Sequence, residues 1–202
     1  MYRFLWTLCW PFFRLFYPYK VIGKKNVDNT PKIMICNHYS NLDILVLGLG
    51  VKRKMRFLGK KELFKGKFVC WFLRKMGVIK IDRQTADIEA IKTCLKALKN
   101  NQMITIFPEG TRNKESDELQ DIKNGACMLA IKAKVEIIPV NILRKAKIFS
   151  KNRLMIGEPF SLEEFYGQRV NNETLDKAGE IVFKKMKELE NANKNYNKKN
   201  KN

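Results

Sequence analysis

KIMICNHYSNLD, residues 32–43, is the stretch of sequence that decides the fold. Its first five residues form a short apolar run after Pro31, which is typical of a buried strand. A polar loop follows, and the apolar residues 42–49 behind that loop indicate a helix. In open α/β sheets, reactive groups lie in loops just beyond the carboxyl ends of strands. The pattern therefore predicts a buried strand that leads into a functional loop.

Apolar runs and amphipathic stretches alternate along the rest of the chain. The clearest helix is residues 85–100, where Ile88, Ile91 and Leu95 recur at helical spacing and Thr85 is a candidate N-cap. Alternating strands and helices predict an α/β domain with a mixed, mostly parallel sheet flanked by helices. The other expected strands are residues 55–58, 77–81, 102–107, 136–142 and 153–157. The other expected helices are residues 123–134 and 174–189, and residues 62–76 are expected to form one helix or two.

The chain is strongly basic. Its 202 residues include 40 Lys and Arg against 20 Asp and Glu, a formal charge of +20, while 45% of the residues are hydrophobic. This length and apolar fraction suit a single folded domain. Half of the charge excess lies in residues 52–83, which contain twelve basic and two acidic side chains. Such a charge favours an anionic partner, either nucleic acid, a membrane surface or an anionic substrate.

Aromatic residues gather at the N-terminus. Nine of the 22 fall within residues 1–19. Pro11 interrupts the apolar run there, which is shorter than the roughly 20 residues that a spanning helix needs. Trp and Tyr prefer the bilayer interface because each has an apolar body and a polar tip. We therefore expect an interfacial helix or helical hairpin, and a helix packed on the protein's own core is the alternative.

Composition divides the chain into three expected parts. These are a membrane-interfacial segment over residues 1–19, an α/β domain over residues 20–190 and a disordered Asn/Lys-rich tail over residues 191–202. The five Cys residues are odd in number and form no CxxC pair, which indicates reduced thiols in a cytosolic compartment. Together these features predict a peripheral or monotopic protein on the cytoplasmic face of the cell membrane.

His38 is the one histidine of the sequence, and Asp43 follows it by five residues. A loop-to-helix turn can fold the imidazole back onto that carboxylate, which would fix the tautomer and leave the other ring nitrogen free as a base. No Ser or Cys stands in a nucleophile elbow. The pair therefore indicates base catalysis on a substrate hydroxyl or on water, against the alternative of a structural histidine.

A second polar loop, FPEGTR at residues 107–112, follows the expected strand 102–107. Gly110 permits a tight turn. Thr111, Arg112 and backbone N–H groups suit a phosphate, since Arg binds phosphate in bidentate geometry. Glu109 is unusual in an anion site, so we expect it to orient donors or to bond a substrate hydroxyl. The alternative is a β-turn with a surface salt bridge.

These two loops, in this order, resemble motifs of the glycerolipid acyltransferase family, and more narrowly of the lysophosphatidate (1-acylglycerol-3-phosphate) acyltransferases. Two weaker matches fit the order of the family's motifs: GKKEL at residues 59–63 leading to VIKIDR at residues 78–83, and IIPV at residues 137–140. The chain departs from the usual pattern at Lys80, at residues 113–114 and at residues 121–122. No departure falls on a residue of the two main motifs.

The resemblance implies a reaction and a role for each motif residue. His38 would take the proton from the sn-2 hydroxyl of lysophosphatidate, and that hydroxyl would attack an acyl thioester directly, without an acyl-enzyme, to give phosphatidate. Asp43 would orient His38 and stabilise its charged form. The residues implied for the acceptor are Lys60, Arg83 and Arg112, which would hold its phosphate, and Glu109, Gly110 and Thr111, which would shape its site.

The implied partners are acyl-CoA or acyl carrier protein as donor, lysophosphatidate and a membrane phospholipid surface. We expect no metal and no cofactor, because no ligand cluster is present. Glycerol-3-phosphate or another lysophospholipid is the alternative acceptor. A nucleic-acid-binding module would explain the charge, but the sequence has no such motif and does not interleave aromatic with basic residues. An inactive membrane scaffold would have no need of the His38–Asp43 pair.

Overall fold

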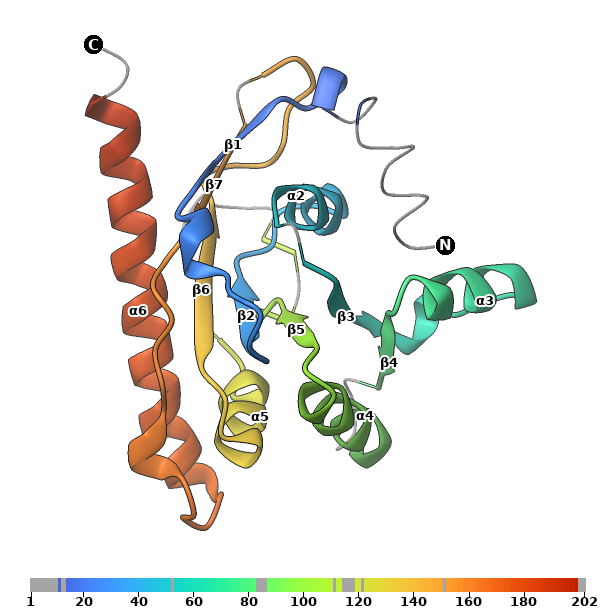
Figure 1. Ribbon diagram of the computed structural model, residues 1–202, viewed down its shortest axis with the longest axis vertical. Helices are drawn as coiled ribbons and strands as arrows, with labels where there is room; N and C mark the ends of the chain where they lie inside the picture. Colours follow the sequence, from blue (N-terminus) through green and yellow to red (C-terminus); the bar gives the residue numbers. More distant parts are fainter. Residues whose placement is uncertain are drawn as a thin grey trace.

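The computed structural model describes residues 11, 14–51, 53–82, 87–110, 112–113, 119–120, 122–150 and 152–199. Its centre is a seven-stranded sheet with the order β1-β7-β6-β2-β5-β3-β4 (Figure 1). The strands are β1 (Tyr19–Ile22), β2 (Ile33–Cys36), β3 (Met55–Lys60), β4 (Ile79–Ile81), β5 (Met103–Ile106), β6 (Ile137–Ile142) and β7 (Asn152–Ile156). The helices are α2 (Leu42–Gly50), α3 (Lys67–Lys75), α4 (Ile88–Lys99), α5 (Gly125–Ala133) and α6 (Asn172–Lys199), with 3₁₀ turns η1 (Lys24–Asn26), η2 (Lys61–Leu63) and η3 (Glu163–Phe165).

The sheet is mixed and mostly parallel, as predicted. Strands β6, β2, β5, β3 and β4 all pair in parallel. Strand β7 runs antiparallel to β6, and β1 pairs with β7 in parallel. All four residues of the central strand β2 are buried. A continuous apolar run suits such a strand because helices cover both of its faces.

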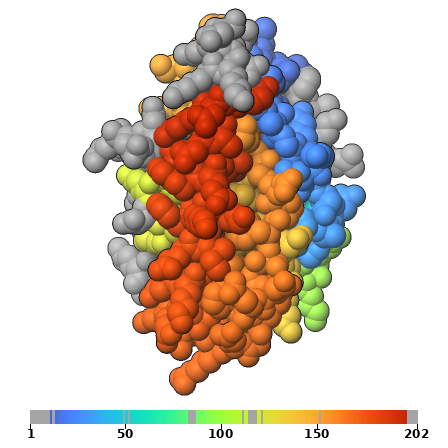
Figure 2. Space-filling view, turned by 90° about the vertical axis from the view of Figure 1, so that its left-hand side faces the viewer, coloured from blue at the N-terminus to red at the C-terminus, as the bar shows by residue number. Residues whose placement is uncertain are grey.

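Each face of the sheet has its own apolar cluster. Ile33 and Ile35 of β2 join the cluster beneath α4, α5 and α6. Met34 and Cys36 join the cluster beneath α2, because successive side chains of a strand point to opposite faces. Helix α6 packs against β6 and α5 and runs along one side of the molecule (Figure 2). The four cysteines that the structure describes are free thiols, and three of them are buried.

Several expected boundaries change. Helix α4 begins after Asp87, whose carboxylate accepts a hydrogen bond from the N–H of Ala90, so Asp87 and not Thr85 is the N-cap. The stretch expected over residues 62–76 as one helix or two is divided into η2 and α3 at Gly66, which has a φ of 79°. Strand β1 has no counterpart among the predicted elements. It forms because β7 offers it a parallel partner, which local pattern does not reveal.

The expected disordered tail is wrong over residues 191–199, because α6 continues to Lys199. The buried Asn193 side chain explains why. Its amide donates hydrogen bonds to the carbonyl and side-chain oxygens of Asn141, at 3.2 and 2.7 Å. Its Oδ1 accepts one from Nε of Arg153 at 2.6 Å. These partners lie on β6 and β7, so an Asn/Lys-rich composition could not predict them. Residues 200–202 lie outside the described part.

The predicted interfacial segment falls mostly on residues that the structure does not describe. Of residues 1–19, Pro11 and residues 14–16 are helical, and Tyr19 already belongs to β1. Within the described part of the chain, no helix combines the length and apolarity needed to cross a bilayer.

Candidate active site

Two loops meet at one edge of the sheet. Strands β2 and β5 are parallel neighbours, so the loops that follow them leave from the same edge. The N–H of Asn113 donates to the carbonyl of His38 at 2.7 Å and ties the two loops together. The rings of His38 and Phe107 stack with centroids 4.0 Å apart. The two motifs, 64 residues apart along the chain, therefore form one site.

The His38–Asp43 pair has the predicted geometry. Nδ1 of His38 lies 2.9 Å from Oδ2 of Asp43, whose side chain is fully buried. Oδ2 also accepts the backbone N–H groups of Tyr39 and Ser40 at 2.7 Å each, and Oδ1 accepts the Ser40 hydroxyl at 3.2 Å. These donors hold the carboxylate rigidly in the first turn of α2. When Nδ1–H donates to Asp43, Nε2 of His38 is left as the basic nitrogen.

The loop that holds His38 is anchored at both ends. The Asn37 side chain donates to the carbonyl of Ile142 at 2.9 Å and accepts from its N–H at 2.8 Å, which fastens the loop to β6. Ser40 Oγ accepts the N–H of Leu42, the first residue of α2, at 3.2 Å. The imidazole is therefore positioned by backbone contacts on two elements.

His38 lines a cavity of about 530 Å³. Its side chain is 14% exposed, which is enough for contact with a ligand. Most of the residues that line the cavity are apolar. The apolar wall comprises Ile44, Phe57, Leu58, Leu63, Leu73, Val78 and Phe107 with Gly59, and the polar lining comprises His38, Asn41, Lys60, Arg112 and Gln120.

Two of the predicted phosphate ligands line this cavity with His38. Lys60 ends β3, and exposed Arg112 lies with Nη1 3.5 Å from Oδ1 of Asn41. Lys61 instead pairs with Asp82 at 2.6 Å, and that hydrogen bond and charge raise the pKa of Lys61. The other two predicted ligands of the acceptor, Arg83 and Thr111, lie outside the described residues.

Glu109 is a buried carboxyl in the second loop. It is 6% exposed, and neither carboxylate oxygen has a hydrogen-bond partner among the described residues. Burial raises the pKa of Glu109 to about 7, and the charge of Asp43 adds to the rise. The backbone N–H of His38 offsets part of it, although its geometry falls short of a hydrogen bond. A buried polar group of this kind is typical of a functional site.

Gly110 makes the turn of the second loop. Its φ is 73°, and its N–H donates to the carbonyl of Phe107 at 3.1 Å. A Cβ at this position would lie 2.9 Å from the Lys123 side chain. The backbone conformation therefore favours glycine here, whereas the flexible end of the Lys123 side chain could move away from a Cβ.

A family model described as Acyltransferase matches residues 18–143, more than half of the chain. The chain belongs to the acyltransferase family. The matched region contains the His38–Asp43 pair and the loop of residues 107–112, so the family resemblance of these two motifs is confirmed.

Named relatives agree with this assignment. The 1-acyl-sn-glycerol-3-phosphate acyltransferase of Bacillus subtilis is 32% identical over 179 residues, covering 85% of this chain and 88% of the relative. The protein of that name from Saccharomyces cerevisiae is 34% identical over 82% of this chain, which spans 56% of the yeast protein. The crystal structure of the 1-acyl-sn-glycerophosphate (LPA) acyltransferase PlsC from Thermotoga maritima matches with a TM-score of 0.68 and 25% identity, over 93% of this chain and 80% of that one.

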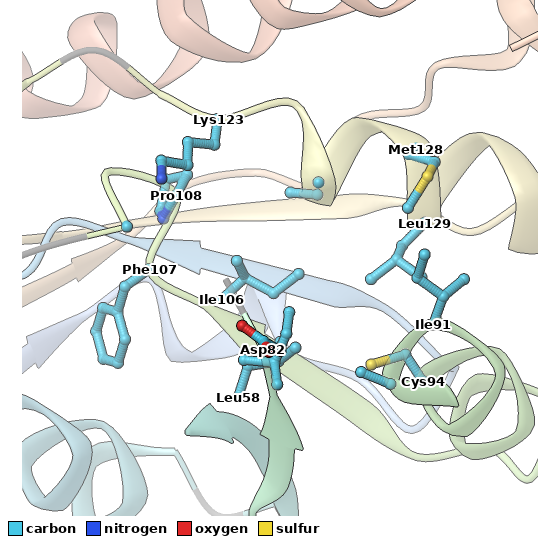
Figure 3. A pocket seen from close by; sticks show the side chains of 15 residues that line it. Leu58, Asp82, Ile91, Cys94, Ile106, Phe107, Pro108, Lys123, Met128 and Leu129 are labelled. Carbon is cyan, nitrogen blue, oxygen red and sulfur yellow. The ribbon is translucent and has the colours of Figure 1, made fainter. Parts of the chain in front are cut away.

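The acyltransferase domain contains a second, smaller cavity. Its volume is about 250 Å³, and it lies between the sheet and helices α4 and α5 (Figure 3). Leu58 and Phe107 line both cavities. Gly110 faces this smaller cavity rather than the one that His38 lines. The charged residues of its lining are Asp82 and Lys123, and the side chains of Ile91, Cys94, Ile106 and Leu129 make its interior apolar.

Two contributions to the site were not predicted from the sequence. Phe107 stacks on the imidazole, and Asn37 fastens the loop to β6. Both residues belong to or adjoin the motifs, but their contacts are made across strands, so spacing along the chain could not assign them. Among the residues that the structure describes, no group of three or more His, Cys, Asp or Glu side chains is placed to hold a metal ion.

Proposed function

We propose that this acyltransferase moves a fatty acyl group from an acyl thioester to the sn-2 hydroxyl of lysophosphatidate, and so makes phosphatidate for phospholipid synthesis. The proposal rests on one observation: the base His38 and the cations Lys60 and Arg112 line the same cavity. The hydroxyl of an acceptor can therefore lie at the base while its phosphate lies at the two cations. The names of the relatives support this acceptor.

The reaction proposed for His38 is general-base catalysis. Nε2 takes the proton of the sn-2 hydroxyl while the hydroxyl oxygen attacks the thioester carbonyl. The new C–O ester bond forms, the C–S bond breaks, and the thiol leaves with the proton returned by the imidazolium. Asp43 stabilises the imidazolium, because its buried carboxylate accepts Nδ1–H at 2.9 Å. Lys60 and Arg112 balance the phosphate charge.

Direct transfer without an acyl-enzyme is supported by the surroundings of the two side chains near His38 that could act as nucleophiles, Ser40 and Cys36. The Ser40 hydroxyl donates its proton to Asp43 and not to His38, and it accepts the N–H of Leu42. Cys36 is fully buried, and burial raises the pKa of its thiol well above the ordinary value. Neither side chain is presented to the His38 cavity. The acceptor hydroxyl itself is therefore the proposed nucleophile.

The proposed donor is acyl-CoA or acyl carrier protein, and the proposed location is the cytoplasmic face of the cell membrane. The aromatic residues 1–19 support an interfacial anchor, and the +20 charge supports attraction to anionic lipid or to an acidic carrier. The proposed reaction uses side chains alone, with neither metal nor cofactor.

Transfer of a labelled acyl group to lysophosphatidate in mixed micelles tests the proposal, with each donor in turn. His38→Ala should lower kcat by about 10²–10⁴-fold, the typical worth of a general base. Arg112→Ala should raise KM for lysophosphatidate, and exposed Arg169→Ala is the matched control. If His38→Ala formed product at the wild-type rate, His38 would be ruled out as the general base. If neither donor gave product, lysophosphatidate would be ruled out as the acceptor, and glycerol-3-phosphate would be tested next.

A further inference from the structure

Helix α3 is unusually exposed for an amphipathic helix. It projects beyond the β4 edge of the sheet (Figure 1), and none of its nine residues is buried. Its nine residues nevertheless include two Phe, one Trp, one Leu and one Val. A helix with so much apolar surface normally packs it against a core. Much of this surface is instead open to solvent.

Three aromatic side chains share one face of α3. Phe68, Trp71 and Phe72 stand at positions i, i+3 and i+4, which are neighbours on a helix surface. They are 74%, 48% and 37% exposed. The Phe68 ring lies 6.0 Å from that of Trp71 and 6.5 Å from that of Phe72 between centroids. A contiguous exposed apolar patch of this kind marks an interaction site.

The surroundings of this patch are basic. Residues 60–75 contain six Lys or Arg side chains and a single acidic one, Glu62. Lys67, Arg74 and Lys75 of α3 are all exposed. Aromatic residues that enter the acyl boundary, with cations that remain at the headgroups, are the pattern of a helix lying in the interface of an anionic membrane. We infer that the aromatic–basic face of α3 (Phe68, Trp71 and Phe72 with Lys67, Arg74 and Lys75) docks on an anionic lipid leaflet.

This docking would bring the active-site cavity to the lipid. Leu73 of α3 and Leu63 of η2 line the His38 cavity, and Leu63 is itself 56% exposed. The same segment therefore forms both the lipid-docking face and one wall of the cavity. A lipid acceptor could pass from the leaflet to His38 without crossing water. This second step rests on the proposed function, whereas the docking does not.

Charge favours lipid over the other occupants of this face. Residues 1–25 of this chain contain five basic and no acidic residues, so they do not complement the basic rim of α3. A second copy of a chain with a charge of +20 would be repelled for the same reason. An acidic protein would complement the charge, and the experiment distinguishes it from a lipid surface.

Trp71 reports on the docking directly. In full-length Trp6→Phe/Trp10→Phe protein, Trp71 is the remaining tryptophan. Its emission should shift to the blue when vesicles of phosphatidylcholine and phosphatidylglycerol are added, and brominated lipid should quench it. Unchanged emission from protein that sediments with the vesicles would overturn the inference. Emission that is already blue-shifted and does not respond to lipid would also overturn it. So would a blue shift that acidic carrier protein produces and vesicles do not.

A pair of variants separates docking from catalysis. Phe68→Ser/Phe72→Ser in the same background should need about tenfold more anionic lipid for the Trp71 shift, since interfacial binding scales with apolar area. Ile88→Ser, which alters an exposed apolar residue of α4, is the matched control and should bind as the parent does. Transfer to a monodisperse short-chain lysophosphatidate should be unaffected by either. If the two variants depended equally on lipid, the docking would be refuted. If the parent protein transferred no acyl group, only the proposed function would be refuted.

Discussion

At the scale of single residues, two buried carboxyl groups of the site differ in their hydrogen bonding. Asp43 accepts two backbone N–H groups, the Ser40 hydroxyl and the His38 imidazole. Glu109, in the loop that follows β5, has no hydrogen-bond partner among the described residues. Environment and not residue type therefore makes Asp43 a fixed partner for the base and leaves Glu109 close to half protonated at neutral pH.

The raised pKa of Glu109 predicts a pH dependence of stability. A carboxyl whose pKa rises from 4.5 to about 7 on folding stabilises the protein fully below pH 4.5, and that contribution is lost as pH rises through 7. The loss amounts to roughly 3 kcal/mol. Urea unfolding at pH 5 and at pH 8 should therefore show a smaller fall for Glu109→Gln than for wild type. Exposed Glu89→Gln is the control, and parallel behaviour of all three proteins would contradict the prediction.

At the scale of elements, one buried side chain stabilises the end of the last helix, although the composition of that segment is typical of a disordered tail. Asn193 lies in the Asn/Lys-rich part of α6, yet it is fully buried between β6 and β7. Its removal would take away the hydrogen bond that its Oδ1 accepts from Nε of Arg153 and those that its amide donates to Asn141. The C-terminal turns of α6 therefore depend on a polar network and not only on apolar packing.

Asn193→Ala should lower the free energy of unfolding by about 1–3 kcal/mol, the cost of leaving buried polar groups unsatisfied. Asn191→Ala changes an exposed Asn of the same helix and controls for helix propensity. Urea denaturation followed by circular dichroism measures both. If the two variants are equally stable, the network contributes nothing to holding α6.

At the scale of the whole molecule, charge and apolar surface act together. The formal charge is +20, and a large share of it lies around the segment that forms one wall of the His38 cavity. The sheet order places β2, β5 and β3 side by side, so Arg112 after β5 and Lys60 at the end of β3 line the same cavity as His38 after β2. Long-range attraction of an anionic surface and short-range binding of a phosphate are therefore directed to the same edge.

Binding to anionic vesicles should weaken as salt rises from about 0.1 M to about 1 M, where the Debye length falls from about 10 Å to about 3 Å. Sedimentation with vesicles of phosphatidylcholine and phosphatidylglycerol measures this, and pure phosphatidylcholine vesicles provide the comparison. The aromatic residues should retain part of the binding at high salt. Binding that does not respond to salt would show that the basic surface plays no part in it.

The sequence alone predicted the His38–Asp43 contact and most of the framework. The KIMIC run predicted β2, alternation of patterns predicted the mixed, mostly parallel sheet, and spacing predicted that Asp43 would fold back on His38. These features are local, because periodicity and a five-residue offset act within one strand or one turn. Such information is contained in neighbouring residues.

Only the tertiary structure decided which distant residues share a site. The pairing of β2 with β5 stacks Phe107 on His38, and the end of β3 turns Lys60 and not Lys61 to the cavity. Strand β1 and the end of α6 form only because β7, Asn141 and Arg153 are there to pair with them. The physical reason is that these contacts join residues 40 or more positions apart, or depend on which way a strand end faces, and neither is encoded in local pattern.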